Sequence, residues 1–437
     1  MKDQVTELWP LHRSLISDGT DEALRIIGEN FPSSGSYAVE NYAAGMEVWT
    51  WKVPPRYVVH EAYLQTEDGE KVVDFRDHPL HLVSYSQPID RWVTWEELVP
   101  HLHYSEKRPE AIPWVWSYYN PAWGFCLPKR RFDRLSRSKR YRAVIRSEFV
   151  TDPAQGLRLG VGVIHPEGGA SPEAGELLVC AHVCHPYQAN DDISGVVTAI
   201  EVARRLAERP LPAGSMSVRF LFVPETIGSI CYLSRHEDLI PRLKGGIFCE
   251  MTGNRASLNL KITRQGNHLL DRIARWVLKR QAGEYREGPF LQQIRNDDLV
   301  INGPGVNAPC LQIGRWPYDE YHTSDDSPEI IHEEMLAGCA SAAEEILRIY
   351  GSNFIPRRTF RGPVFLTRYG LFVDWKQDPK LCLANQEIML RLEGKHSVFD
   401  IAEELDLDYW QAREWLERFR EKGLIRALPI PKLPEDG

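Results

Sequence analysis

Histidines and carboxylates recur at the ends of apolar runs in the central part of the chain, or in the loops that follow these runs. The apolar runs include ELLVCAH, SVRFLFVPE and KGGIFCEM. The polar residues are His182, His185, Asp191, Asp192, Glu225, Glu250 and His322. Imidazole and carboxylate groups bind Zn²⁺, which takes about four ligands and keeps one position open for water in a catalytic site. These residue types therefore suit a catalytic zinc centre.

A parallel α/β sheet would bring these side chains together. Between about residues 140 and 350, strand-like apolar runs alternate with segments of helical periodicity, which is typical of such sheets. In an open α/β sheet, groups beyond the carboxyl ends of the strands collect in one crevice. We therefore expect residues far apart in sequence to converge there.

Each candidate residue also has a purely structural interpretation. Asp191 could cap the helix that follows it, and Glu250 could form an ion pair. Cys180 and Cys184 flank His182 and could form a thiolate-rich site, but Cys180 lies within an apolar run and is more simply a core residue. Only the joint order of the motifs favours a metal centre.

That order resembles the co-catalytic zinc aminopeptidases of the bacterial leucyl aminopeptidase and transferrin-receptor type. The resemblance covers about residues 140–350 and rests on His182, then NDDISG, VPETIGS, FCEMTG and YHTSDD. It implies a three-layer α/β/α fold with a mostly parallel mixed sheet. It also implies that Asp191 bridges two ions and that Glu225 is the general base. The metal ligands that it implies are His182, Asp191, Glu250 and His322.

Two departures from this family leave the number of zinc ions open between one and two. Thr226 stands where the family has a second glutamate, and a neutral hydroxyl is a poor zinc ligand. Cys184 stands where the family usually has an aspartate two residues after the first histidine. A metal-binding role for Glu225 is also open, and it would leave the base unassigned.

The reaction implied by the resemblance is amide hydrolysis, most simply the removal of an N-terminal amino acid. Zinc lowers the pKa of bound water from about 15.7 toward 7, and Glu225 would carry the proton to the leaving amine. The alternatives are an amidase or deacylase, or an acyl transferase, acting on a small non-peptide amide. The expected partner is therefore a peptide or a small-molecule substrate.

Two further units accompany the predicted α/β domain, which comprises residues 1–48 and 131–360. Short strand-like runs rich in Trp and Tyr predict an inserted β-rich domain over 49–130. Its segment WVWSYYNPAW could line a sugar or aromatic pocket, or form the core of the domain. Residues 368–437 have the outline of a winged helix-turn-helix. With these units, nearly the whole chain resembles a bacterial family of unknown function with an aminopeptidase-like domain, often placed in polysaccharide or secondary-metabolite pathways.

The predicted winged helix-turn-helix raises a function of another class, a ligand-sensing regulator that binds DNA. From Met389 to Gly437 there are eight basic and eleven acidic residues, a net charge of −3. DNA phosphates would repel such a surface. The charge disfavours a nucleic-acid partner and favours packing or dimerisation, so a homo-oligomer is one expected assembly.

Composition and charge indicate a globular protein. The chain has 437 residues, of which 43% are hydrophobic and 26% charged, and its net charge of −9 offers no attraction for anionic membranes. The first twenty residues contain no signal-peptide core, and no run of about 18 uncharged apolar residues occurs. The eight scattered cysteines are typical of reduced thiols. These features predict a cytoplasmic protein without a membrane span.

Overall fold

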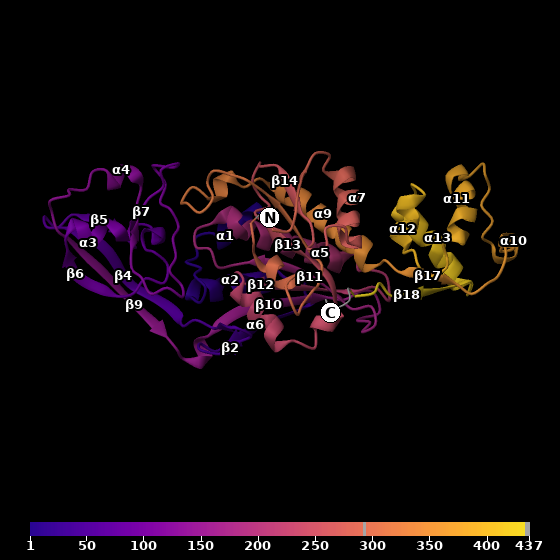
Figure 1. Ribbon diagram of the computed structural model, residues 1–437, viewed down its shortest axis with the longest axis horizontal. Coiled ribbons are helices and arrows are strands. Elements are labelled where there is room, and N and C mark those ends of the chain that lie inside the picture. The colour runs from indigo at the N-terminus through magenta and orange to yellow at the C-terminus, as the bar shows by residue number, and fades with distance from the viewer. Residues whose placement is uncertain (292–293, 433–437) are drawn as a thin grey trace.

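An eight-stranded mixed sheet forms the centre of the computed structural model, which describes residues 1–291 and 294–432 (Figure 1). Its strands, in their order across the sheet, are β1 (Ser36–Tyr42), β10 (Leu157–Ile164), β12 (Ser217–Val223), β11 (Glu176–His182), β13 (Leu243–Glu250), β16 (Cys310–Arg315), β14 (Leu258–Lys261) and β15 (Arg286–Gly288). The four strands from β12 to β16 run parallel to one another. Antiparallel pairings join β10 to β12 and β14 to β16.

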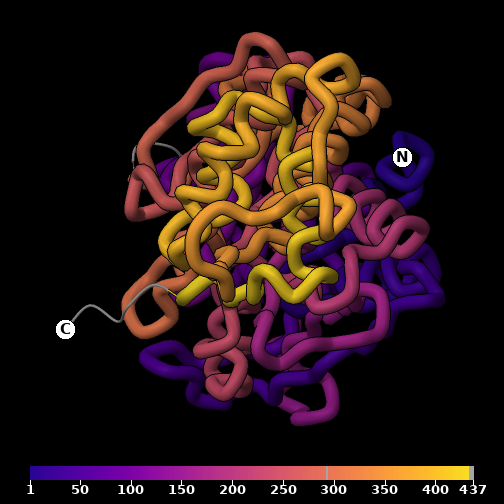
Figure 2. The backbone as a smooth tube through the Cα atoms, turned by 90° about the vertical axis from the view of Figure 1, so that its right-hand side faces the viewer, coloured from indigo at the N-terminus to yellow at the C-terminus, as the bar shows by residue number. Residues whose placement is uncertain are grey.

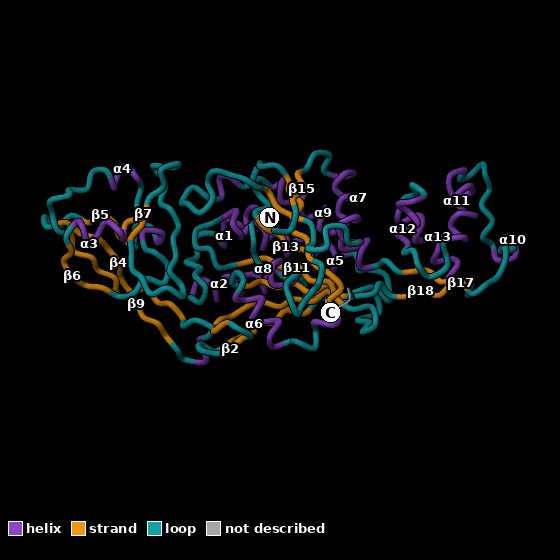
Figure 3. The backbone as a smooth tube through the Cα atoms, viewed as in Figure 1, coloured by secondary structure: helices purple, strands orange, loops and turns teal. Residues whose placement is uncertain are grey.

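Helices cover both faces of this sheet, as Figure 3 shows. On the central strand β11, Leu177 and Val179 belong to the core beneath one helical layer, whereas Leu178 and Cys180 belong to the core beneath the other. Successive side chains of a strand point to opposite faces, so β11 is apolar throughout because both of its faces are buried. The first layer contains α2 (Asp18–Asn30), α5 (Gly195–Glu208), α7 (Leu269–Gln281) and α9 (Glu333–Gly351), and the second contains α6 (Ile227–Arg235) and α8 (Asp297–Ile301). The predicted three-layer α/β/α fold is confirmed.

The Trp- and Tyr-rich segment forms a separate antiparallel sheet, at the left of Figure 1. The strands of this β module, in sheet order, are β5 (Lys71–Asp74), β4 (Arg56–Thr66), β9 (Tyr141–Val150) and β6 (Ile89–Val93). Strand β9 comes after residue 130, so the sheet extends beyond the interval 49–130 expected for the inserted domain. Seven residues after β9 ends, the chain enters β10 of the central sheet.

The C-terminal unit lies at the opposite end of the molecule and faces the viewer in Figure 2. Its helices are α11 (Pro379–Leu390), α12 (Val398–Glu404) and α13 (Tyr409–Glu421), followed by β18 (Ile425–Leu428). Strand β18 pairs antiparallel with β17 (Ile355–Arg358), which directly follows α9. The element order agrees with the one expected, whereas the assignment as a winged helix-turn-helix stays a prediction. Residues 433–437 of the predicted unit lie outside the described residues.

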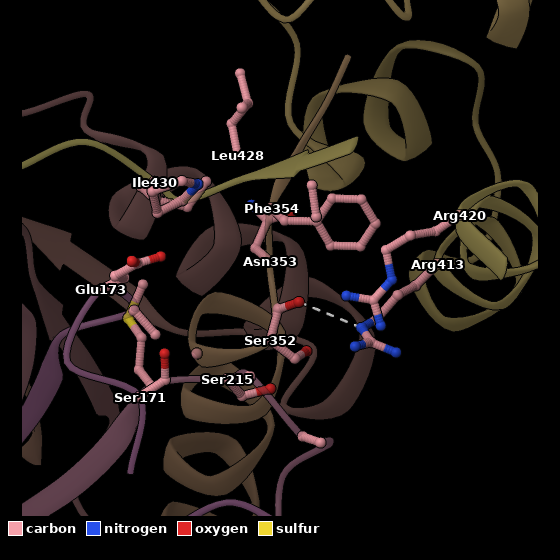
Figure 4. Close-up of a pocket in the computed structure, with 17 residues that line it drawn as sticks. Ser171, Glu173, Ser215, Ser352, Asn353, Phe354, Arg413, Arg420, Leu428 and Ile430 are labelled. Atoms are coloured by element: carbon pink, nitrogen blue, oxygen red, sulfur yellow. Dashed lines mark hydrogen bonds between the residues drawn. The ribbon is translucent and has the colours of Figure 1, made fainter. Parts of the chain in front are cut away.

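Side chains of α13 join the C-terminal unit to the α/β body. Arg413 donates to the carbonyl of Ser352 over 3.2 Å (Figure 4), and Trp410 Nε1 donates to Glu345 over 2.8 Å. A cavity of about 160 Å³ lies at this junction, with Ser171 and Glu173 on the body side. The body and the C-terminal unit therefore share an interface.

Within the described part of the chain, no helix is both long enough and apolar enough to cross a membrane. All eight cysteines are free, and seven of them are buried. Their placement agrees with the thiols expected from the sequence.

Candidate metal centre

The predicted site residues meet at the carboxyl edge of the parallel strands. His182 ends β11, Glu250 ends β13 and Glu225 follows β12, so three adjacent strands each deliver one group to the same edge. Asp191 lies in the segment between β11 and α5, and His322 lies in the loop after β16. The convergence expected of an open α/β sheet is therefore present.

Asp191 is the centre of the cluster. Its Oδ1 lies 3.1 Å from His182 Nε2 and 3.1 Å from His185 Nδ1, and its Oδ2 lies 3.0 Å from His322 Nε2. Glu250 Oε1 lies 3.9 Å from His182 Nε2. One buried carboxylate thus faces three imidazoles, with a second carboxylate beside it.

His185 was among the imidazoles noted in the sequence but not among the four predicted ligands. In the structure its Nδ1 faces Asp191, and its Nε2 lies 3.0 Å from Glu225 Oε2. The spacing His-x-x-His directly after a strand is the signal that could have identified it, because a short loop keeps both rings at the same sheet edge.

The polar atoms of the cluster have the properties of metal ligands. Among the described residues, both oxygens of Asp191, His182 Nε2, His185 Nδ1 and His322 Nε2 are buried and have no hydrogen-bond partner. Buried polar atoms are normally hydrogen-bonded, and a cation between them would supply the missing interactions. The side chains His182, Asp191 and Glu250 form one group whose ligand atoms lie within 4.8 Å of one another, and His185, Asp191 and His322 form a second. The residues present therefore fit a metal ion.

The pKa values of two carboxylates of the cluster, Asp191 and Glu225, are shifted downward. Burial raises the pKa of Asp191, but His185, His182 and His322 outweigh burial and hold this pKa well below its ordinary value. Burial also raises the pKa of Glu225, and the hydrogen bond and charge of His185 lower it below its ordinary value. Both shifts favour the charged form, in which a carboxylate can bind a cation or accept a proton.

Two amide side chains orient Glu250. Asn296 Nδ2 donates to Glu250 Oε1, and Gln312 Nε2 donates to Glu250 Oε2. Burial raises the pKa of Glu250. Partners of this kind fix the direction of a ligand and are part of a metal site's construction.

Asp192 has a structural role next to the cluster. Its carboxylate accepts from the backbone amides of His182 at 3.1 Å, Gly195 at 3.1 Å and Met251 at 2.9 Å. These bonds tie the ends of β11 and β13 to the start of α5. A Cβ at Gly195 would lie 2.3 Å from the carbonyl oxygen of Cys249, so only glycine fits this close approach.

The two residues that depart from the zinc aminopeptidase pattern make backbone contacts. Thr226 has a positive φ of 62°, and its amide donates to Asp297 Oδ1 over 3.0 Å. Cys184 Sγ accepts from the amide of Glu225 over 3.1 Å. Burial raises the pKa of the Cys184 thiol, but His185 and His182 outweigh it and lower the pKa to about 7. Because residue 226 is a threonine, this position offers no carboxylate to a metal.

Aromatic rings of the β module close one side of the cluster. The ring centroid of Trp114 lies 4.2 Å from that of His185 and 4.7 Å from that of His322. The ring centroid of Trp116 lies 5.4 Å from that of His322. Trp114 is buried, whereas Trp116 is 43% exposed. On the other side, Tyr321 stacks on His322 at 3.7 Å. The aromatic segment noted in the sequence thus forms both a packed contact and an exposed ring beside the site.

Sequence comparison identifies close relatives of the chain. A family model described as "Domain of unknown function (DUF4910)" matches residues 2–353. A Clostridium acetobutylicum protein, described as a candidate polysaccharide biosynthesis protein with an aminopeptidase-like domain, is 32% identical over 351 residues, which is 80% of this chain and 77% of that protein.

Structural comparison agrees with the sequence comparison. A crystal structure of a candidate peptidase from Clostridium acetobutylicum has a TM-score of 0.82 at 29% identity and covers 98% of this chain and 95% of its own. A zinc aminopeptidase from Bacillus subtilis has a TM-score of 0.59 at 17% identity, covering 78% and 93%. A Peptidase M28 precursor from Shewanella amazonensis has a TM-score of 0.55 at 13% identity, covering 79% and 92%. The resemblance to zinc aminopeptidases is therefore confirmed for the fold, and the chain belongs to the family described as Domain of unknown function (DUF4910).

Proposed function

We propose that the chain is a zinc-dependent hydrolase that cleaves an amide bond, with Glu225 as the general base. The observation that carries this proposal is the pair of buried, unpartnered oxygens of Asp191 among three imidazoles. The aminopeptidase-like fold supports it, because the cluster lies at the carboxyl edge of the parallel strands, where ligands of open α/β sheets collect.

His182, Asp191 and Glu250 would hold the zinc ion, with His322 facing the second oxygen of Asp191. A bound zinc ion supplies a Lewis acid that polarises the amide carbonyl and makes water more acidic. Asn296 and Gln312 keep Glu250 directed into the site.

Glu225 is the carboxylate of the cluster that solvent can reach. Its side chain is 28% exposed, against 1% for both Asp191 and Glu250. As an anion at neutral pH it accepts a proton from the attacking water and passes it to the leaving amine. General acid–base catalysis of this kind contributes about 10²- to 10⁴-fold to a rate.

A second candidate reaction is deacylation of a small non-peptide amide, such as an acylated sugar. The name of the Clostridium acetobutylicum relative, which places it in polysaccharide biosynthesis, favours this candidate. The exposed ring of Trp116 beside His322 offers an apolar face on which a sugar or an aromatic ring could stack. We also propose that the protein is cytoplasmic, which its free thiols support.

Removal and return of the metal test the proposal. The full chain is stripped with a chelator, reloaded with zinc and assayed with aminoacyl p-nitroanilides and with N-acetylated amino sugars. We expect the zinc-loaded protein to hydrolyse one of the two classes, the stripped protein to be inactive, and zinc to restore the activity. Turnover of the anilides supports the aminopeptidase, and turnover of the sugars supports the deacylase. Activity that is unchanged in the stripped protein would contradict the proposal.

A further inference from the structure

We propose that His185 replaces the glutamate ligand that this chain lacks and completes a second metal site with Asp191 and His322. The inference rests on the proposed function, because it assumes that His182, Asp191 and Glu250 hold the first ion. It adds a ligand outside the set implied by the aminopeptidase resemblance, and it keeps the bridging role that the resemblance implies for Asp191.

The geometry gives the second site the same number of protein ligands as the first. His185 Nδ1 and His322 Nε2 lie 3.1 and 3.0 Å from different oxygens of Asp191. All three residues offer ligand atoms within 4.8 Å of one another, as do those of the first group. Imidazole nitrogen is a common ligand of zinc, so an imidazole can take the place of a carboxylate.

The contact between His185 and Glu225 selects the tautomer that such a ligand requires. His185 Nε2 lies 3.0 Å from Glu225 Oε2, where the ring nitrogen can donate its proton to the carboxylate oxygen. A ring that donates from Nε2 can offer the lone pair of Nδ1 to a cation, and Nδ1 lies 3.1 Å from Asp191 Oδ1. A carboxylate that orients a ligating histidine in this way is a recurrent feature of zinc sites.

The loop that carries His185 is anchored on both sides of the histidine. The buried side chain of Arg13 donates to the carbonyl of Val183 over 2.9 Å and to that of Gln188 over 3.2 Å. The ring of Trp114 packs against His185 at 4.2 Å. Because the loop and the ring are both held, Nδ1 stays at the position where a cation would need it.

A competing arrangement would use Cys184. His182, Cys184 and His185 also lie within 4.8 Å of one another and could form a single thiolate-containing site. Cys184 Sγ already accepts from the amide of Glu225, which favours a structural role for the thiol. A Cys184→Ser variant separates the two arrangements, because the proposed pair of sites does not need the thiol.

The test counts metal ions in the full chain after saturation with zinc and removal of free ion, by mass spectrometry of the metal. We expect two zinc ions per wild-type chain, one in His185→Gln, one in His322→Gln and two in Cys184→Ser. His60→Gln, which alters an exposed histidine paired with Glu148, is the matched control and retains two. His322→Gln keeps the test decisive should His185→Gln fail to fold, which thermal unfolding reports.

The outcomes separate this inference from the proposed function. One ion in the wild type and one in His185→Gln would overturn the second site and leave the first intact. No ion in the wild type would overturn the proposed function itself. Loss of an ion in Cys184→Ser would replace the second site by the thiolate arrangement.

Discussion

At the scale of single residues, the neighbours of a carboxylate decide what it does. Asp191 and Asp192 are adjacent and both buried, yet Asp191 faces three imidazoles while Asp192 accepts three backbone amides. One aspartate is therefore available to a cation, and the other holds the strands and the helix in place. The residue types alone do not distinguish the two, because each could have capped the helix, and only the resemblance to zinc aminopeptidases singled out Asp191.

Glu225→Gln tests the proposed base. Glutamine keeps the size of the side chain but cannot accept the proton of water, so we expect kcat to fall by about 10²- to 10⁴-fold with the zinc content unchanged. Steady-state kinetics and metal analysis of the same sample measure the two quantities. Glu148→Gln, an exposed glutamate, is the control. Full activity of Glu225→Gln would exclude the assigned role.

His12 makes stability depend on pH. Burial, and then the charge of Arg13, lower its pKa from 6.5 to about 4, so between these values the unfolded chain binds a proton that the folded chain does not. Stability is therefore lost as the pH falls from about 6.5 toward 4. Because the residue is only partly buried, we expect the loss of stability between pH 7 and pH 5 to be larger in the wild type than in His12→Gln, by on the order of 1 kcal/mol. Urea unfolding of both proteins at pH 7 and pH 5 measures the difference, and equal losses would contradict the assignment.

At the scale of elements, the start of α5 is the tightest junction beside the site. Gly195→Ala would place a Cβ 2.3 Å from the Cys249 carbonyl, and overpacking of this kind costs about 1–3 kcal/mol. Gly338→Ala in α9 is the matched control, since its Cβ meets no atom within 4 Å and alanine stabilises a helix by about 1 kcal/mol over glycine. We expect the two variants to shift the free energy of unfolding in opposite directions. A neutral Gly195→Ala would show that the junction can relax.

Elements differed in how far they could be predicted from the sequence. The middle strands β11 and β13 of the central sheet were predictable because they are buried on both faces and read as continuous apolar runs. The pairing of β9 with β4 could not be predicted, because β9 follows a long loop and the two strands lie far apart in the sequence. The convergence of His182, Asp191, Glu250 and His322 could be expected from the order of motifs, and their role as ligands remains a prediction. His185 was among the candidate residues but not among the predicted ligands, because the resemblance assigned no role to its position.

At the scale of the whole molecule, the contacts of α13 bear on nucleic-acid binding. Arg413 and Arg420 both pair with Glu417, and Arg418 donates to the carbonyl of Gly370. Cations already engaged in this way, on a unit of net negative charge, attract phosphates weakly. We predict that the full chain is not retained on heparin at low salt. Retention that disappears when the residues after about 375 are deleted would contradict this prediction.

The β module and the α/β body meet along the loop that carries His322. The amide of Trp114 donates to the carbonyl of His322 over 2.8 Å, Ile112 and Ser324 exchange two further hydrogen bonds, and Arg108 pairs with Asp325. A displacement of residues 108–114 would move the loop that carries His322, because the two segments are hydrogen-bonded to each other. A molecule that binds to the β module and shifts this segment would thereby change the position of His322 relative to Asp191.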